Sequence, residues 1–403
     1  MDKQDEAPIP RIALDGPSAL VFYRDLSSQA TSPADKKPNW KTASSAPVPD
    51  NAYLSDEDVA ATLLEENVFG RLAPSDELSP SDDCGPSELE MVRCDMQSLG
   101  YCASASRDLK RIPYESLGVL PPSEHFPLFI LTGSTQSRRV VKNVRQRTCT
   151  LAFPRRSFFR VNDTVYVPCP ELLFVLMSRY LSLSGLILLG MELCGHYRLA
   201  GSSPRRPLEG VETLYDQRPL TTVDRLTRFV TLMDNSSGIK DARRALKYIA
   251  DGAASPMESI LYLLLCLPRS LGGYGISTPV LNAKRPVTKS AGSLTFSKHL
   301  IPDLYWPQQR LDVEYDSEEF HSSPDRLAAG ARRTLALRAM HVEVVSITYD
   351  IISDSTAFNT TARMIVRRLG MRNYKASPTV EKGRTALRSS LLHHEDIYTH
   401  LPS

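Results

Sequence analysis

The fold is decided by the stretch Pro302-Asp303-Leu304-Tyr305-Trp306-Pro307-Gln308-Gln309-Arg310-Leu311-Asp312-Val313-Glu314-Tyr315-Asp316. Its pattern predicts two short strands joined by a turn over residues 307–310. If Trp306 pairs with Leu311, the same antiparallel register places Asp303 opposite Glu314. The two acids would then lie side by side, one on each strand.

The two faces of this predicted ribbon differ in chemistry, because side chains alternate between the faces of a strand. One face is apolar and can be buried; it holds Leu304, Trp306, Leu311, Val313 and Tyr315. The other face carries the acids Asp303, Asp312, Glu314 and Asp316. Like charges directly opposite each other destabilise a sheet. The ribbon therefore predicts a carboxylate cluster that a divalent cation holds together.

The same stretch resembles a known family. A Pro-Asp pair, the acid Glu314 on the next strand and an Asp-x-x-x-x-His run from Asp316 to His321 resemble the PD-(D/E)XK nuclease superfamily. Within it, the stretch is most similar to the branch related to the very-short-patch-repair endonucleases. The alternative interpretation is an acidic surface hairpin that contains a Pro-Asp pair by chance.

The resemblance implies a metal-dependent DNA endonuclease in which Asp303 and Glu314 ligate Mg²⁺ or Mn²⁺. Phosphodiester hydrolysis needs such an ion to neutralise charge and activate water. In this branch, a Ser-Pro-x-Glu-Ser run opens the first helix and supplies another metal-ligating carboxylate. Residues 255–259 match that run, with Glu258 as the acid. Glu258 equally fits a capping box with Ser255, so both roles stay open.

Three positions depart from the pattern of the family. Asp316 stands where many members have a lysine, so the general acid–base chemistry is expected to move to Asp316 and His321. Ser317 replaces the glycine that usually follows, and Gly330 stands where relatives usually have an acid. The alternative is a copy of the fold that no longer cuts.

The order of predicted elements in residues 221–375 favours a nuclease-like domain. The expected elements are a helix over 259–267, a strand over 293–299, the ribbon, a helix over 325–340, a strand over 342–348 and a helix over 355–370. The superfamily has this order, so the expected fold class is α/β, with a restriction-endonuclease-like α/β sandwich in the C-terminal part.

The predicted helix over residues 325–340 has two faces of interest. Leu327, Ala331 and Leu335 recur at four-residue spacing and predict its buried stripe. Arg326 and Arg333 lie on another face, and matching arginines sit near the active site in the resembled proteins. We therefore take both arginines as candidate nucleic-acid contacts; a solvated face is the alternative.

Composition sets the broad class of the protein. The chain has 403 residues, of which 42% are hydrophobic, and this length predicts roughly two or three domains. Its seven cysteines show no zinc-like spacing, which favours reduced thiols and a cytoplasmic location. The charged start lacks the apolar region of a signal peptide, and no long uncharged apolar run predicts a membrane span.

Charge is distributed unevenly along the chain. The first 100 residues carry 8 Lys+Arg and 19 Asp+Glu, whereas the remaining residues carry 40 and 27. A basic remainder favours DNA as the partner, double- or single-stranded. Two helices predicted over 223–233 and 239–250 fit this, because the second presents Lys240, Arg243, Arg244 and Lys247 on one side. They predict either a helix-turn-helix or a helical lead-in to the next domain.

The rest of the chain divides by composition. The expected parts are a docking element (1–27), an acidic low-complexity and largely disordered segment (28–110), a small α+β domain with an apolar helical hairpin (120–200) and a flexible tail (376–403). Glu192, in the second hairpin helix, is expected to have a core or capping role.

A second, weaker resemblance concerns residues 14–24 and 125–199, which are similar to AbiEi-type antitoxins that repress their own operons. It implies the rival function, a DNA-binding transcriptional regulator with a degenerate nuclease fold. Besides DNA, the partners expected from this resemblance are a second copy of the chain, in a homodimer, or a toxin protein.

Overall fold

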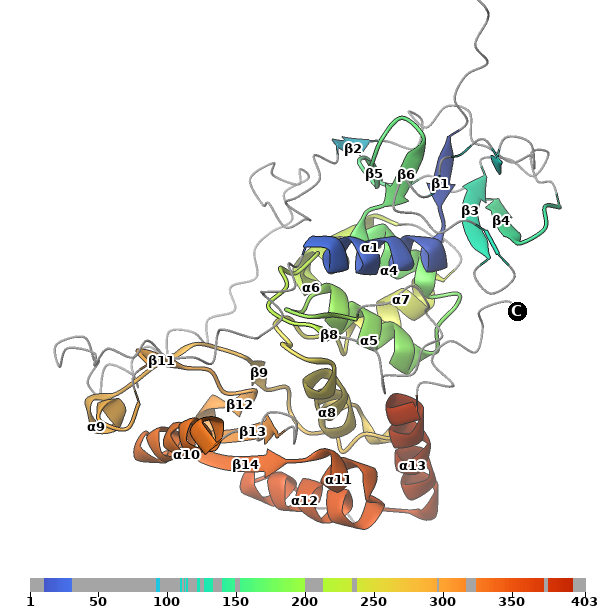
Figure 1. Cartoon of the computed structure of the whole chain (residues 1–403). Helices are drawn as coiled ribbons and strands as arrows, with labels where there is room; N and C mark the ends of the chain where they lie inside the picture. The colour runs from blue at the N-terminus through green and yellow to red at the C-terminus, as the bar shows by residue number, and fades with distance from the viewer. Residues whose placement is uncertain are drawn as a thin grey trace, which may run out of the picture. The chain divides into compact units, whose positions relative to one another are not determined.

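The computed structural model describes most of the chain beyond the acidic segment (Figure 1). The described residues are 11–30, 92–94, 109–110, 112, 114, 122–123, 127–132, 140–148, 153–199, 213–233, 238–295, 297–316, 324–372 and 376–393. Most of the segment 28–110 lies outside them. They form two compact units: unit 1 holds the described residues up to Ile249, and unit 2 those from Ala250 to Leu392. Both combine helices with mixed sheets, which confirms the α/β expectation.

Unit 1 is built on a mixed sheet with the strand order β2-β5-β6-β1-β3-β4. Its strands are β1 (Ile12–Leu14), β2 (Val92–Cys94), β3 (Leu128–Thr132), β4 (Val144–Thr148), β5 (Phe158–Arg160) and β6 (Val165–Pro168). The strand β1 lies in the middle, antiparallel to β3 and parallel to β6. The first apolar segment of the chain is therefore part of the core of unit 1.

Helices pack around this sheet, and a two-stranded pair lies between them in sequence. The elements are α1 (Gly16–Ala30), α4 (Pro170–Met177), α5 (Leu183–Leu193), β7 (Arg198–Leu199), β8 (Thr213–Leu214), α6 (Val223–Leu232) and α7 (Ile239–Leu246). The helices α4 and α5 form the predicted apolar hairpin, and Ser182 caps α5 by accepting a hydrogen bond from the Gly185 amide (3.2 Å). In the part of the chain that is described, no helix is long and apolar enough to cross a bilayer.

The boundary between the units differs from the expected one. The helices α6 and α7 pack on α4 and α5 and so belong to unit 1, because their buried side chains meet that hairpin. The compact units therefore divide between Ile249 and Ala250, whereas the sequence placed the boundary near residue 221.

A buried ion pair links the first helix of unit 1 to the end of α5. Arg24 donates from Nε to Oε1 of Glu192 (3.0 Å) and from Nη2 to Oε2 (2.7 Å). The amide of Leu199 donates to the same Oε1 (3.2 Å), and Arg198, fully buried, donates to four backbone carbonyls around the end of α5. Glu192 thus has the core role that its sequence context favoured.

Unit 2 contains a four-stranded sheet with the order β14-β13-β12-β9. Its strands are β9 (Val280–Leu281), β12 (Leu304–Trp306), β13 (Leu311–Tyr315) and β14 (Glu343–Ile347). The 3₁₀ turn η7 (Pro307–Gln309) joins β12 to β13 and ends at Arg310, whose φ of 51° is left-handed. The strand β14 is parallel to β13, while β12 is antiparallel to both of its neighbours.

The sequence placed one strand of this sheet wrongly. Residues 293–299 were expected to form the strand that precedes the ribbon. The chain instead forms a second small pair, β10 (Arg285–Pro286) with β11 (His299–Leu300), around the short helix α9 (Lys289–Gly292). The neighbour of β12 is β9, only two residues long, which is too short to give a periodic signal.

Unit 2 also contains six helical segments among its described residues. They are α8 (Pro256–Cys266), η6 (Arg269–Leu271), α10 (Pro324–Ala339), α11 (Tyr349–Ser353), α12 (Ser355–Arg368) and α13 (Pro378–His393). The helix α8 contacts β13. Ala336 and Leu337 of α10 pack with Tyr305 of β12, so α10 lies over the face of the sheet that also holds the acids.

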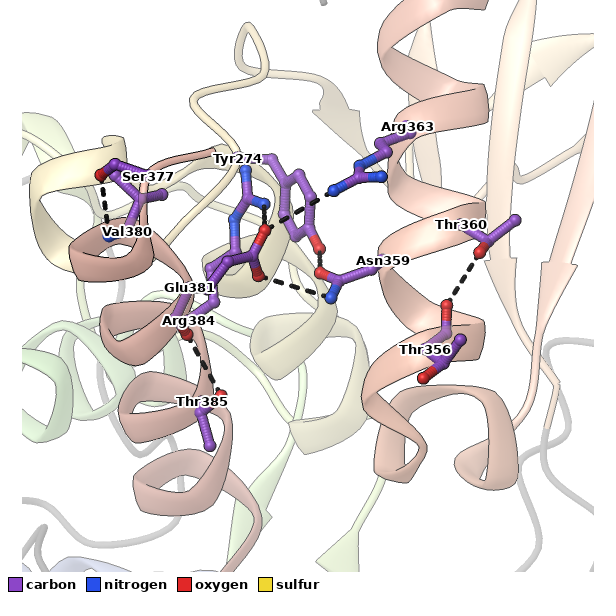
Figure 2. Close-up of polar contacts among 10 residues, drawn as sticks. All are labelled: Tyr274, Thr356, Asn359, Thr360, Arg363, Ser377, Val380, Glu381, Arg384 and Thr385. Carbon is purple, nitrogen blue, oxygen red and sulfur yellow. Dashed lines mark hydrogen bonds and ion pairs between the residues drawn. The ribbon is translucent and has the colours of Figure 1, made fainter. Parts of the chain in front are cut away.

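The helix α13 replaces the flexible tail expected for the C-terminal residues. Figure 2 shows how polar side chains join it to α12 and to Tyr274. The Arg384 guanidinium lies 3.9 Å from the centre of the Tyr274 ring and donates to Glu381 (3.0 Å). The Tyr274 hydroxyl donates to Asn359 of α12. Leu387, Leu391 and Leu392 of α13 are buried, so apolar packing holds the helix together with these polar contacts.

Candidate functional site

The hairpin of β12 and β13 has the predicted register. Trp306 pairs with Leu311, and Leu304 pairs with Val313. The Trp306 indole donates to the Ser277 carbonyl (2.7 Å) and fixes the end of the strand. Both faces of the hairpin are buried as far as Val313, and Glu314 and Tyr315 are partly buried. The sequence did not predict this, because it offered only the apolar face for burial.

Asp303 directly precedes β12 and points along the sheet. Its side chain is buried, with the residue 2% exposed, and its Oδ2 accepts a hydrogen bond from the Tyr315 amide (3.1 Å). This contact reaches the end of β13, one residue beyond Glu314. The carboxylates of Asp303 and Glu314 therefore occupy neighbouring strands on one face, as the register predicts.

Asp312 lies on the same face, two residues before Glu314, and is completely buried. Its partners across the strands are Tyr305 on β12 and Val344 on β14. No donor among the described residues makes a hydrogen bond to either carboxylate oxygen of Asp312. Burial, and after it the carboxylates of Glu314 and Asp303, raise the pKa of Asp312 well above its ordinary value.

Arg333 of α10 provides positive charge to this cluster. Its guanidinium donates to Oε1 of Glu314 and to the carbonyl of Ile301. Burial opposes the charge of Arg333, but the carboxylates of Glu314, Asp303 and Asp312 outweigh burial and raise its pKa above the ordinary value. In this structure, the arginine expected to contact nucleic acid is instead paired with the acids.

The helix α10 is turned relative to the predicted orientation. Ala331 and Leu335, expected to be buried, are exposed, Leu335 to 50%. The residues that face the sheet are Ala336 and Leu337, and Arg333 precedes them by one helical turn. The helix thus buries Leu337 and Ala336 in place of Leu335 and Ala331, and Arg333 lies on the same side. The side chain of Leu327 lies outside the described residues.

Glu258 caps the helix that carries it and also contacts a loop of unit 2. Ser255 accepts a hydrogen bond from the Glu258 amide (3.1 Å), as in a capping box. A capping box would use the backbone amide of Ser255, but the Glu258 carboxylate accepts a hydrogen bond from the amide one residue earlier, that of Ala254 (2.9 Å). It also accepts a hydrogen bond from the side-chain amide of Asn282 (2.6 Å). The backbone amide of Asn282 donates a hydrogen bond to the backbone carbonyl of Asp303 (3.1 Å). Glu258 is thus linked through Asn282 to the backbone of Asp303 and not to its carboxylate; its role as a metal ligand stays a prediction.

The remaining candidates of the C-terminal half are only partly visible. The Asp316 amide donates to the Ile347 carbonyl (2.9 Å) at the end of β13, and its side chain is partly exposed. His321, Ser317 and the side chain of Arg326 lie outside the described residues. Gly330 is exposed on α10, and a side chain added there would meet no atom within 4 Å.

The basic candidates Lys240, Arg243 and Arg244 lie on α7 of unit 1 and Lys247 directly follows it; all four are exposed. Ala242 and Ala245 form the buried side of this helix. Arg243 also donates to the Met233 carbonyl (3.0 Å), which joins α7 to the end of α6. The predicted orientation of α7 is therefore confirmed, while its nucleic-acid role stays a prediction.

The cluster of unit 2 fits a hard cation in the type of its donors. Asp303, Asp312 and Glu314 offer only carboxylate oxygens, which Mg²⁺ prefers, and Mg²⁺ needs just one or two of them besides water. Within the described ranges, no group of three or more His, Cys, Asp or Glu side chains is arranged so that it could hold a metal ion. Arg333, bound to Glu314, supplies the counter-charge in this arrangement.

Two participants were missed from the sequence. Asp312 was placed on the acidic face but not among the site residues, although its spacing of two from Glu314 was a usable signal. Asn282 gave no signal, because it lies in a short loop and acts only through Glu258 and Asp303. Comparison with family models, curated proteins and solved structures finds no match for this chain.

Proposed function

We propose that unit 2 is a metal-dependent endonuclease that hydrolyses phosphodiester bonds of DNA, in phage defence or DNA repair. The observation that carries the proposal is the register of β12 and β13, which sets the buried Asp303 beside the partly buried Glu314 on one face. Bringing two carboxylates together in a buried place is costly unless a cation joins them. A divalent ion held there would neutralise charge on the scissile phosphate and lower the pKa of the attacking water.

The residues have distinct roles in this proposal. Asp303 and Glu314 hold the cation, and Glu258, which Asn282 links to the backbone of Asp303, adds a further oxygen ligand. Asp316, at the end of β13, and His321 exchange protons with water and the leaving group. Arg326 and Arg333 are proposed to contact the nucleic-acid backbone, because a guanidinium binds phosphate in two-pronged geometry.

Cleavage assays test the proposal directly. The full chain is incubated with single-stranded, duplex and mismatched DNA in the presence of Mg²⁺ or Mn²⁺. We expect cleavage that requires the metal and is lost in Asp303→Asn and in Glu314→Gln. Glu343→Gln is the matched control, because Glu343 lies on β14 but is exposed and pairs with Arg368 at the surface. Absence of metal-dependent cleavage on every substrate would contradict the proposal.

The exposed basic side of α7 favours a second candidate function, a DNA-binding transcriptional regulator of the AbiEi-antitoxin kind. Cations on one helix face neutralise phosphates, and their binding weakens steeply with salt. If the protein has this second function, we expect the full chain to bind a promoter fragment tightly and to leave it uncut. Binding should decrease in the combined variant Lys240→Ala, Arg244→Ala, Lys247→Ala and should not change in Asp303→Asn.

A further inference from the structure

The four-stranded sheet of unit 2 has two chemically different ends. The acids lie at the end where β12 begins and β13 stops. The opposite end, where η7 joins these strands, is formed by residues 307–311, 336–344 and 364–369, which contain four arginines, one histidine and a single acid. That acid, Glu343, is paired with Arg368. The other three cations, called here the arginine end, are all exposed: Arg310, Arg338 and Arg367.

Contacts around Glu343, the first residue of β14, bring the three segments together. Its amide donates to the Arg310 carbonyl (2.8 Å), so the turn η7 lies beside the start of β14. Its carboxylate accepts from Nε of Arg368, which places the last turn of α12 there. Arg338 belongs to the last turn of α10, and its carbonyl accepts from the His341 amide (2.9 Å) just before β14. Cations from three elements therefore share one end of the sheet.

The backbone at this end indicates more than a solvated surface. Arg310 has φ of 51° and His341 has φ of 59°, both in the left-handed region that favours glycine. Attraction to the helix dipole accounts for basic residues at the ends of α10 and α12, but not for Arg310, which follows a 3₁₀ turn. Sparsely populated backbone conformations cluster at functional sites. The two residues therefore favour a binding role for this end of the sheet.

The chemistry of the arginine end fits a phosphate backbone. A guanidinium forms two parallel hydrogen bonds with a phosphate, and the single acid of the three segments is already bound to Arg368. Gln308 and Gln309 of η7 are exposed, and their amides can donate to phosphate or sugar oxygens. A membrane-binding surface would need a wide apolar face, but Met364 is the one large apolar side chain exposed in these three described segments. Nucleic acid is therefore the partner that fits best.

We propose that the arginine end binds the phosphate backbone of DNA beside the proposed cleavage site. This inference rests on DNA as the substrate of the proposed function, but not on a metal ion or on cleavage. Arg310 precedes Glu314 by four residues along β13, which corresponds to about 13 Å. B-DNA rises about 3.4 Å per base pair, so this distance spans roughly four base pairs. The arginines therefore hold flanking phosphates and not the scissile phosphate itself.

Binding of DNA without a metal ion tests the inference. The full chain is titrated into a fluorescein-labelled DNA duplex in EDTA, and fluorescence anisotropy gives the affinity at several KCl concentrations. Each phosphate contact contributes about 0.9 to the slope of log K against log salt. We therefore expect the slope to fall by about 2.7, and the affinity by at least about tenfold, in the combined variant Arg310→Gln, Arg338→Gln, Arg367→Gln.

A charge-matched control separates this surface from the charge of the whole chain. The combined variant Lys110→Gln, Arg155→Gln, Lys382→Gln removes three cations from exposed positions outside the arginine end, and the slope should change little. Thermal unfolding of each variant shows that it is folded. If the combined arginine variant does not fold, Arg338→Gln and Arg367→Gln, both at exposed helical positions, are measured singly. An unchanged slope in both then overturns the inference.

The outcomes separate this inference from the proposed function. Binding that depends on the arginine end, without cleavage of any DNA, supports the inference and removes the nuclease. Cleavage, with binding that the arginine variant leaves unchanged, overturns the inference and leaves the nuclease in place. Binding lost only in the α7 variant Lys240→Ala, Arg244→Ala, Lys247→Ala overturns it in favour of the transcriptional regulator. Absence of DNA binding by the wild-type chain, or binding to phosphatidylserine vesicles in its place, also overturns it.

Discussion

The carboxylate of Asp303 accepts a hydrogen bond from the backbone amide of Tyr315 across 3.1 Å. This bond joins the start of β12 to the end of β13, at the point where the ladder of backbone bonds stops. It turns Asp303 toward the sheet and away from solvent. The acids of the two strands are therefore held together by the backbone as well as by Arg333.

Asp312→Asn is expected to stabilise unit 2 at neutral pH when no metal is added. The substitution keeps the shape of the side chain and removes a buried carboxyl that lacks a donor, a gain of about 1–3 kcal/mol in the free energy of unfolding. Unfolding of unit 2 in urea is followed by the fluorescence of Trp306, which lies in β12 and is 2% exposed. Trp40 is replaced by Phe in every variant, so that Trp306 is the single fluorescent tryptophan. Asp350→Asn is the control, because Asp350 is an exposed residue of α11; it should change the free energy of unfolding by no more than about 0.5 kcal/mol.

The gain from Asp312→Asn should also depend on pH. The pKa of Asp312 is raised above its usual value of 3.8, so the folded state binds the proton more tightly than the unfolded state. The cost of Asp312 is therefore absent below that usual value, grows as pH rises, and is complete above the raised pKa. The two proteins should be equally stable in acid and diverge toward neutral pH; a constant difference across this range would contradict the assignment.

Gly272→Ala tests how closely α13 approaches η6. Gly272 has φ of +90°, and a Cβ there would clash with the Gly383 carbonyl oxygen. Gly370→Ala is the matched control, because φ is +67° but no atom lies within 4 Å of the added carbon. Both should lose about 1–2 kcal/mol from the left-handed backbone, and Gly272→Ala a further 1–3 kcal/mol, roughly, from the clash. Equal losses in urea unfolding would show that α13 is not held against this turn.

The polar contacts of Tyr274 should contribute separately to the stability of unit 2 (Figure 2). Tyr274→Phe removes the hydroxyl that bonds Asn359 but keeps the ring beneath Arg384, so a loss of about 1 kcal/mol is expected. Tyr274→Leu also removes the ring from the guanidinium and should lose more. Indistinguishable unfolding of the two variants would mean that the ring does not contribute through Arg384.

Arg24→Met should loosen α1 in unit 1. It leaves Glu192 buried without its main partner, which typically costs about 3–5 kcal/mol. Hydrogen exchange of the α1 amides is the measurement, because it reports this unit separately. Arg160→Met, which breaks an exposed pair with Asp163, is the control and should leave exchange nearly unchanged. Similar exchange in the two variants would contradict the role given to the buried pair.

Much of the fold of unit 2 could be predicted from the sequence, where local pattern and packing agree. Strict alternation from Leu311 to Tyr315 predicted the hairpin and its register, and the β-branched run near residue 345 predicted β14. The orientation of α10 was predicted wrongly: Ala336 and Leu337 face the sheet, Leu335 is exposed, and Arg333 contacts Glu314. Apolar periodicity carries no information about such a contact.

Only the part of the candidate site that depends on local strand pairing was predicted from the sequence. Asp303 and Glu314 follow from register alone. The burial of Asp312 requires knowing that α10 lies above that face, and the link from Glu258 to Asp303 requires the position of Asn282. Both depend on residues distant in the sequence, which hydropathy and strand pairing do not connect.

The shortness of the turn η7 has a kinetic consequence. Asp303 and Glu314 are only 11 residues apart, whereas Arg333 follows Glu314 by 19 residues and arrives on another element. Local hairpins close within about 1–10 μs, earlier than contacts that need longer loops. The carboxylates therefore meet before their counter-ion, and mutual repulsion slows the first step of folding. Salt screens that repulsion, so refolding should accelerate with ionic strength; a salt-independent rate would mean that α10 docks first.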